Sequence, residues 1–444
     1  MTATAAQKPS PDGPHPKTPP PKTPPPKTPG ADPAAESSTG SRSARFVAFG
    51  RALDRPLTSY HLVLGVSALL LTLGLVMVLS ASSVLSLRQT DGASSYSIFL
   101  RQVMWVSVGL PMMFVATRLS ARNWRRLAYP ALLGTLVLLL LVQVPGLGVE
   151  VKGNRNWIEF GGPFRLQPSE FAKLALVLWG ADLLTRKRAL LRQWRHLIVP
   201  LIPVGGILAT LVMLGRDLGT TMVLLAILLV LMWVVGTPFR LFLFAGSLVT
   251  AVLVYFIAQD AERLSRVTGF MDPFAQLQGS GFQGGHSLLA LSTGGWWGVG
   301  LGASRQKWGT LPEAHTDFIF AVIGEELGLV GTLAVIALFG LLAYAGLRIA
   351  SRTTDQFTRL AASAATGWLT VQALVNIGAV IGVLPITGIP LPLVSYGGSA
   401  LLPTMLAIGM LLSFARNEPG APEALAARRR NSLRHVFLPS RPYR

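Results

Sequence analysis

The residues best suited to chemistry are acidic side chains in the segment LPEAHTDFIFAVIGEELGLVG, residues 311–331. We expect Asp317 in the first turn of a helix, with Glu325 and Glu326 about 12 Å deeper, at about 1.5 Å per residue. The helix is apolar, and a carboxylate inside hydrocarbon is costly unless it faces a cavity or a partner. Asp317 could serve as a general base on a substrate hydroxyl. It could equally cap the helix, where the helix dipole stabilises a carboxylate.

A second polar segment, RNWIEFGGPFRLQPSEFAK, covers residues 155–173. Gln167 and the Pro-Ser-Glu that follows are typical of a helix start, because proline suits the first turn and glutamate the positive end of the dipole. Glu170 and Lys173 are three residues apart and therefore share a helix face. They predict a structural ion pair, a surface that binds a pyrophosphate, or both. Arg155 and Lys173 are the favoured anion contacts, because guanidinium and ammonium groups are common phosphate partners.

Prolines punctuate a third segment, PITGIPLPLVSYGGS, at residues 385–399. Irregular backbone at membrane depth is tolerated only against protein or around a cavity, so we expect Ser395 and its neighbours to line a lipid groove. Arg216 and Asp217, in a short turn, predict a local ion pair. The sequence lacks the GxxxxGK[ST] phosphate loop and the HExxH zinc motif. Its G-x-G-x-G run follows no expected strand, which argues against dinucleotide binding.

The elements that must position these residues are membrane helices. Of the 444 residues, 51% are hydrophobic and only 13% are charged. Apolar runs of about 20 residues predict an all-α polytopic membrane protein with about ten spans. We expect the spans near residues 59–81, 102–118, 127–145, 168–185, 196–214, 218–235, 239–257, 318–347, 358–384 and 400–415. The chain contains no cysteine, which excludes disulfides and thiolate chemistry.

The positive charges predict how the helices are oriented. The net charge is +19, and the basic residues cluster in alternate connections and in the C-terminal tail. If those connections are cytoplasmic, both termini are cytoplasmic too. The other interpretation of a basic chain, nucleic-acid binding, needs a basic folded face with a recognisable motif, and the sequence has none.

The opposite side then carries a large extracytoplasmic loop, residues 258–317, between the seventh and eighth spans. A loop of this length is uncommon unless it has a function. Within it, residues 281–295 could form a short interfacial or re-entrant helix, followed by Trp296 and Trp297 at the membrane interface.

The chain divides into three parts. Residues 1–55 are rich in Pro, Thr, Ser and Lys, cannot form a core, and are expected to be a disordered cytoplasmic tail. This tail could also dock a partner or bind anionic lipid. Residues 56–415 are expected to form the transmembrane domain, and residues 416–444 a basic cytoplasmic tail.

Four segments in order resemble the SEDS family of ten-helix membrane proteins, which includes FtsW, RodA and SpoVE. They are RNWIEFGGPFRLQPSEFAK, GFQGGHSLLALSTGGWWGVGLG, LPEAHTDFIFAVIGEELGLVG and PITGIPLPLVSYGGS. The resemblance covers about residues 59–415. The segments GLVMVLSAS and IGEELG are more similar to the division branch, FtsW, than to the elongation branch, RodA. The segment GRDLGT departs from the family, which usually has Gln-Pro before this aspartate.

The resemblance implies a peptidoglycan glycosyltransferase that polymerises lipid II at the outer face of the cytoplasmic membrane, at the division septum. The family's essential aspartate falls on Asp317, its Q-P-S-E-x-x-K positions on Gln167, Glu170 and Lys173, and the preceding arginine on Arg155. We expect Asp317 to act as the base in a one-step inverting reaction that releases undecaprenyl pyrophosphate.

The resemblance also implies partners. These are a class B penicillin-binding protein, which is a transpeptidase, and other divisome proteins. A divalent cation, Mg²⁺ or Mn²⁺, is expected to help stabilise the diphosphate, and no organic cofactor is expected.

Other functions are compatible with the sequence. A lipid II flippase could line its path with Lys173, Glu325 and Glu326, but the polar residues gather near one face and no inverted repeat is evident. A non-catalytic divisome scaffold could use the two tails and would tolerate neutralisation of Asp317. A polymerase that serves elongation, as RodA does, is a further alternative.

Overall fold

The computed structural model describes residues 57–427, except residues 152, 160, 162–163, 191–193, 275–276, 278, 280 and 425. The described residues belong to one compact unit, Arg55–Arg444. The expected tail at residues 1–55 and the part of the C-terminal tail beyond residue 427 lie outside the described residues.

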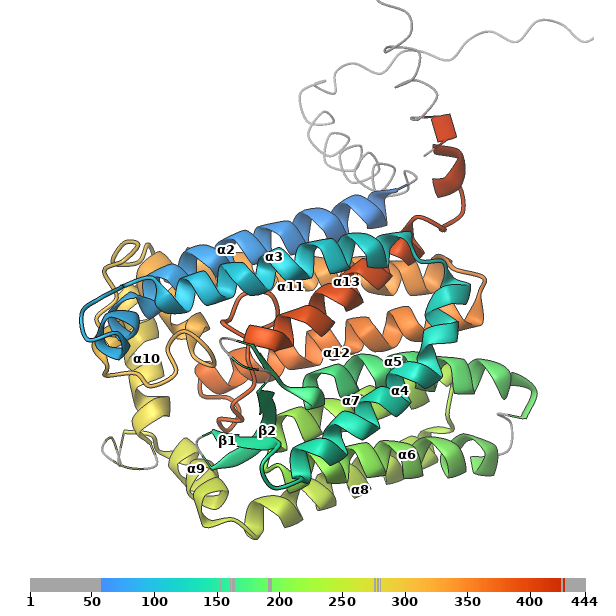
Figure 1. The fold of residues 1–444 in the computed structure, drawn as a ribbon, viewed down its shortest axis with the longest axis horizontal. Helices are drawn as coiled ribbons and strands as arrows, with labels where there is room; N and C mark the ends of the chain where they lie inside the picture. Colours follow the sequence, from blue (N-terminus) through green and yellow to red (C-terminus); the bar gives the residue numbers. More distant parts are fainter. Residues whose placement is uncertain are drawn as a thin grey trace, which may run out of the picture. The chain divides into compact units, whose positions relative to one another are not determined.

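A long helix lies at each of the ten predicted spans in the described part of the chain (Figure 1). These helices are α2 (Thr58–Gln89), α3 (Ser97–Arg118), α4 (Ala121–Gln143), α5 (Pro168–Arg186), α6 (Trp194–Leu214), α7 (Leu218–Val235), α8 (Phe239–Ala258), α11 (Ile319–Arg352), α12 (Gln356–Val380) and α13 (Leu401–Ala415). Eight of them are long and apolar enough to cross a membrane. The other two are α5, which carries charged side chains, and α6, in which residues 199–214 form an apolar stretch.

The helix ends follow from local sequence. Ser120 caps α4 by accepting a hydrogen bond from the backbone N–H of Asn123, and Asp355 caps α12 in the same way. Gly236 ends α7 in a left-handed conformation, with φ of 82°, which glycine adopts without strain. Apolar runs therefore determine where the helices form, and short polar residues and glycine determine where they begin and end.

The segments predicted to be connections also contain regular structure. Residues 148–166 form a small antiparallel sheet in the order β1 (Gly148–Val151), β2 (Asn154–Glu159) and β3 (Arg165–Leu166). The expectation of an all-α chain therefore missed this sheet, whose short strands carry little periodicity. The large loop contains α9 (Ala261–Met271) and α10 (Phe282–Gly294), and α10 confirms the short helix predicted at residues 281–295.

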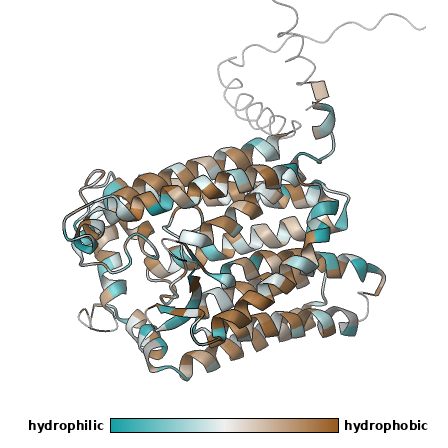
Figure 2. Ribbon diagram, in the orientation of Figure 1, coloured by the Kyte–Doolittle hydropathy of each residue, from teal (hydrophilic) through white to brown (hydrophobic). Residues whose placement is uncertain are grey.

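The core lies around α12 and α13. In the apolar stretch that contains α13, 94% of the residues are buried, and in that of α12 72%, against only 6% in that of α8. Helices distant in sequence pack together, with α13 on α3, α11 on α2, and α12 on α5 and α7 (Figure 1). The consecutive helices α11 and α12 also pack on each other. Hydrophobic residues predominate along the helices, and hydrophilic residues gather at their ends (Figure 2). α8 is therefore a peripheral helix, and α12 a central one.

Helix α11 is broken at Gly328, where φ is 68° and ψ is −166°. The backbone of residues 295–300 enters at the break. The N–H groups of Val299 and Gly300 donate to the carbonyls of Glu325 and Glu326, at 2.9 and 3.1 Å, and Leu329 N–H donates to Gly295 O at 2.9 Å. These bonds satisfy backbone groups that the break would otherwise leave unpaired. The predicted span 318–347 gave no sign of this interruption.

We expect Gly298→Ala to destabilise the fold more than Gly300→Ala. Both glycines have positive φ, so alanine costs about 1–2 kcal/mol at either position. A Cβ at Gly298 would also lie 2.2 Å from the carbonyl oxygen of Glu326, whereas one at Gly300 would meet nothing within 4 Å. The clash adds about 1–3 kcal/mol. Unfolding of the two variants in detergent measures the difference, and equal losses would contradict the close approach.

Candidate functional site

Asp317 lies at the entry to α11 and faces the segment of residues 385–399, here called the proline loop. α11 begins at Ile319 with Phe318 at its N-cap, so Asp317 is neither in the first turn nor the capping residue, contrary to both expectations. Its side chain is half-buried. The carboxylate oxygen Oδ2 lies 3.7 Å from where a Cβ on Gly388 would stand. The carboxylate therefore lies against glycine backbone of the proline loop.

Helix α12 ties Asp317 to the proline loop through side-chain amides. Asn376 Nδ2 donates to the backbone carbonyls of Asp317 and Ile389, both at 2.7 Å. One turn earlier, Gln372 Nε2 donates to the carbonyl of Pro390 at 2.9 Å. The loop itself contacts the residues before α11, because Tyr396 N–H donates to His315 O at 2.9 Å. These bonds hold the carboxylate-bearing segment and the loop together.

The predicted ion pair of α5 is confirmed. Lys173 Nζ lies 2.7 Å from Glu170 Oε2, and the two side chains are 0% and 3% exposed. The ammonium also donates to Gln372 Oε1 at 3.0 Å and lies 5.3 Å from the centre of the Trp368 ring. The pair thus joins α5 to α12. A contact between Lys173 and a pyrophosphate would require this buried pair to open, and it stays a prediction.

Gln167, the residue before α5, is held by a carboxylate that sequence reasoning had assigned elsewhere. Gln167 Nε2 donates to Asp217 Oδ2 at 3.0 Å, and Ser169 Oγ donates to the same oxygen at 3.2 Å. Asp217 also caps α7 by accepting from Thr220 N–H at 2.8 Å. Gln167 N–H donates to Ser399 Oγ at 2.9 Å. Asp217, expected to pair with Arg216, thus organises the junction of α5 and α7.

We expect Asp217→Ala to cost more stability than Asp355→Ala. Each aspartate caps a helix, and losing a cap costs about 0.5–2 kcal/mol. Only Asp217 also accepts from side chains of another helix, and leaving those donors unsatisfied adds about 1–3 kcal/mol. Unfolding midpoints in detergent compare the two variants. A smaller loss for Asp217→Ala would contradict the bridging role.

Ser395 and Arg155 differ in how accessible they are to a ligand. Ser395 is 3% exposed, its hydroxyl accepts from Leu391 N–H at 2.8 Å, and its carbonyl accepts from Gln102 Nε2. These contacts shape the proline loop, and the lipid contact predicted for Ser395 stays a prediction. Arg155 lies on β2 and is half-buried. Among the described residues, no salt bridge holds its guanidinium.

Two arginines, Arg101 and Arg165, lie beside the proline loop. Burial raises the pKa of Tyr396, and the nearby Arg101 and Arg165 partly offset that effect. The Tyr396 phenol therefore stays protonated at neutral pH and serves as a hydrogen-bonding group rather than a base. Both arginines are exposed. With Arg155, they give this face cations that could meet an anionic ligand.

The two glutamates of α11, Glu325 and Glu326, hold residues of the large loop in place and do not line a path across the membrane. Glu325 accepts from Ser304 Oγ at 2.5 Å and from Arg305 N–H at 2.9 Å. Glu326 Oε1 accepts from Ser80 Oγ at 2.6 Å and from Ser304 N–H at 3.3 Å. They are 0% and 1% exposed. In this structure they therefore do not provide the charged path that a flippase would need.

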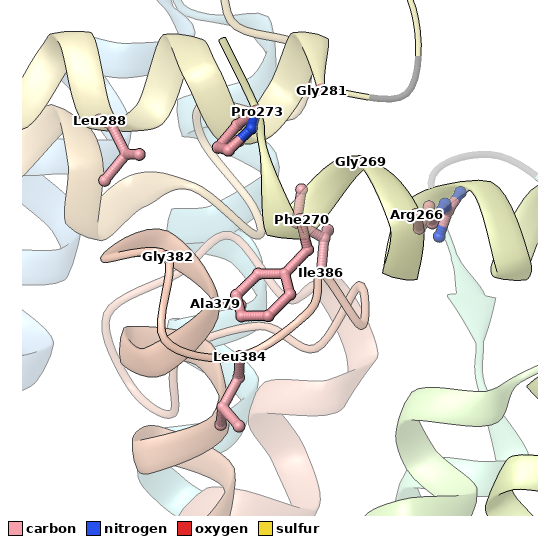
Figure 3. A pocket seen from close by; sticks show the side chains of 11 residues that line it. Arg266, Gly269, Phe270, Pro273, Gly281, Leu288, Ala379, Gly382, Leu384 and Ile386 are labelled. Carbon is pink, nitrogen blue, oxygen red and sulfur yellow. The ribbon is translucent and has the colours of Figure 1, made fainter. Parts of the chain in front are cut away.

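An apolar pocket lies between α9, α10 and the end of α12 (Figure 3). It is lined by Phe270, Leu288, Leu384, Ile386 and several glycines, and Arg266 also belongs to its lining. Ile386 belongs to the proline loop, two residues before the glycine that faces Asp317. The pocket therefore borders the same loop as the candidate base.

The divalent cation expected to help stabilise the diphosphate would have one carboxylate, that of Asp317, to bind at this site. Among the described residues, no group of three or more Asp, Glu or His side chains could hold a metal ion. Mg²⁺ is commonly held by one or two carboxylates together with substrate phosphates and water. Asp317 fits that mode of binding, but not a cage built from protein ligands alone.

Known proteins are similar to this chain in both sequence and fold. The family model FTSW_RODA_SPOVE, described as a cell cycle protein, matches residues 60–419. The probable peptidoglycan glycosyltransferase FtsW of Mycobacterium tuberculosis is 44% identical over 405 residues, which are 91% of this chain and 76% of the relative. Stage V sporulation protein E of Bacillus subtilis is 37% identical over 351 residues, 79% of this chain and 95% of the relative.

Solved structures of related proteins have a similar fold. A structure titled "Structural coordination of polymerization and crosslinking by a peptidoglycan synthase complex" matches with a TM-score of 0.65 at 30% identity, covering 80% of this chain and 97% of that one. The rod shape determining protein RodA of Thermus thermophilus matches with a TM-score of 0.59 at 30% identity, covering 80% and 96%. The resemblance seen in the sequence is thus confirmed, and the chain belongs to the FtsW, RodA and SpoVE family of multi-span membrane proteins.

Proposed function

We propose that this protein is a peptidoglycan glycosyltransferase that polymerises lipid II into glycan strands during cell division. The observation that carries the proposal is Asp317, a half-buried carboxylate held between the entry to α11 and the proline loop. Relatives named peptidoglycan glycosyltransferase FtsW support the reaction and the division role. The protein would work in the cytoplasmic membrane at the septum, with both termini cytoplasmic and Asp317 at the outer face.

In the proposed reaction, Asp317 accepts the proton of the acceptor sugar hydroxyl as that oxygen attacks the anomeric carbon of the donor. The new bond forms between this oxygen and the carbon, while the bond from the carbon to the diphosphate oxygen breaks. Undecaprenyl pyrophosphate leaves with the electron pair. One displacement inverts the configuration of the donor sugar. Base catalysis of this kind contributes about 10²–10⁴-fold.

The cations of the site would stabilise the charge that develops on the diphosphate. Arg155, Arg101 and Arg165 are the proposed contacts, because fixed positive groups near a leaving diphosphate lower the barrier. Lys173 would act indirectly, through Gln372 and the proline loop, while its pair with Glu170 stays closed. A bound Mg²⁺ or Mn²⁺ would supply further positive charge to the phosphate oxygens, with Asp317 as its protein ligand.

A class B penicillin-binding protein is the proposed partner. The support is the structural neighbour, whose title describes coordination of polymerization and crosslinking in a peptidoglycan synthase complex. Crosslinking requires a transpeptidase, which would be the separate penicillin-binding protein. Other divisome proteins would bring the pair to the septum.

Polymerisation of lipid II by the purified full-length chain in liposomes tests this function. The assay compares the chain alone with the chain plus its class B penicillin-binding protein, with Mg²⁺ or Mn²⁺ present. Long glycan strands on a gel are the expected product. No strands under any of these conditions, together with transbilayer movement of labelled lipid II, would replace the polymerase with a flippase.

A further inference from the structure

We infer that Asn376 of α12 is a positioning residue for Asp317, holding the carboxylate against the proline loop through the backbone. This inference rests on the proposed function. It assigns a role to a buried residue near the C-terminal end of α12, which ends at Val380. The sequence alone gave it no part.

The geometry of the amide is specific. Asn376 is 3% exposed, and its single NH₂ group donates one hydrogen to Asp317 O and the other to Ile389 O. Both acceptors are carbonyls, so the amide can only be oriented with its nitrogen towards them. The two bonds therefore fix the separation between the start of α11 and the proline loop. The Asp317 carboxylate lies between those two segments, beside Gly388.

The proline loop needs such donors because its own sequence cannot supply them. Pro390 and Pro392 have no backbone N–H, so this stretch of loop cannot form a regular hydrogen-bonded ladder. The carbonyls of Ile389 and Pro390 are satisfied instead by Asn376 and Gln372. These two side chains are four residues apart and share one face of α12. Only Asn376 also bonds to the residue that carries the candidate base.

Asn376 carries a cost that a purely structural position would avoid. Its amide oxygen Oδ1 is buried and has no hydrogen-bond partner. An apolar side chain of similar size would leave no such atom unsatisfied. Residues that break a packing rule in this way are concentrated at functional sites. The hydrogen bonds donated by the Asn376 NH₂ group are therefore what this position contributes, although its amide oxygen is left without a partner.

Steady-state polymerisation of lipid II by the full-length protein in liposomes tests the inference with Asn376→Leu. We expect the turnover number to fall about 100-fold, the loss typical of a catalytic group displaced by about 1 Å. KM should stay within about two-fold of wild type, since the inference gives the buried Asn376 no contact with substrate. Gln143→Leu is the matched control. It removes another amide that joins two helices, α4 and α6, through Leu211 O at 3.3 Å, and turnover should be unchanged.

A second arm separates positioning from general support. On an Asp317→Asn background, Asn376→Leu should lower the residual rate no further, because residues that act as a unit are not additive. A further loss on that background, a change confined to KM, or wild-type turnover in the single variant would each overturn the inference.

Folding is checked by monodisperse elution and by the unfolding midpoint in detergent. If Asn376→Leu does not fold, Asn376→Asp replaces it, because the carboxylate keeps the size but cannot donate to two carbonyls at neutral pH. If neither variant folds, Asn376 is a structural residue and the inference fails. Wild-type protein without polymerase activity would instead remove the proposed function, and this inference with it.

Discussion

Asp317→Asn should lower the rate of lipid II polymerisation by about 10²–10⁴-fold while leaving the fold intact, because the amide cannot accept the proton of the acceptor hydroxyl. The side chain keeps its size, and the backbone bond from Asn376 to Asp317 O does not involve it. Glycan strands made by purified wild-type and variant protein in liposomes give the ratio. Asp317→Glu keeps a carboxylate but moves it, and its polymerisation rate should lie between those of the wild type and Asp317→Asn.

The matched control for this prediction is Asp91→Asn. Asp91 lies in the turn between α2 and α3, is exposed, and has a φ of 48°, a left-handed conformation that asparagine tolerates as well as aspartate. This variant makes the same change of charge away from the proline loop and should polymerise at the wild-type rate. A well-folded Asp317→Asn with near-normal activity would show that Asp317 is not the base and that another group accepts the proton.

Lys173→Met should destabilise the protein by about 3–5 kcal/mol, the usual result of removing one member of a buried ion pair. The partner, Glu170, is buried with Lys173 and would be left as an uncompensated carboxylate beside apolar side chains. Gln372 and Trp368 would lose their contacts with the ammonium as well. The unfolding midpoint in detergent, at fixed pH and salt, measures the loss.

The exposed pair between Arg165 and Glu159 provides the control. Its side chains are 50% and 36% exposed, so Glu159→Gln should change stability by less than about 1 kcal/mol. If Lys173→Met costs no more than Glu159→Gln, the pair is not a structural element of the core.

The double variant Lys173→Met, Glu170→Leu decides whether the pair has a role beyond stability. Removing both charges should recover much of the loss, since apolar pairs of similar size often replace buried ion pairs at little cost. If Lys173 acts only through packing, polymerisation should return with stability. If Lys173 binds the diphosphate, the stable double variant should remain inactive, which would require the buried pair to open during the reaction.

The positions of the helices could be predicted from the sequence because hydropathy is a local property. Each predicted span coincides with a helix, since an apolar run of about 20 residues must satisfy its own backbone hydrogen bonds. The Glu170–Lys173 pair was predictable for the same reason, because residues three apart share a helix face. The four ordered motifs also sufficed to identify the family.

The interruptions and junctions could not be predicted in this way. The break at Gly328 depends on backbone donors from residues 295–300, and the sheet at residues 148–166 has strands too short to show a period. Asp217 looked like half of a local ion pair, but its side-chain partners, Gln167 and Ser169, lie 50 and 48 residues earlier in the sequence.

By itself, the sequence determined a membrane protein of this family, with helices at predictable positions and, at Asp317, a motif that resembles the one carrying the family's essential aspartate. Only the tertiary structure decided how that aspartate is held. Gln372 and Asn376 are ordinary polar residues in an apolar helix until the chain returns and places the carbonyls of Ile389 and Pro390 beside them. The physical reason is that hydropathy and helix period act between near neighbours. The hydrogen bonds of the site instead join segments that meet only after the helices have packed.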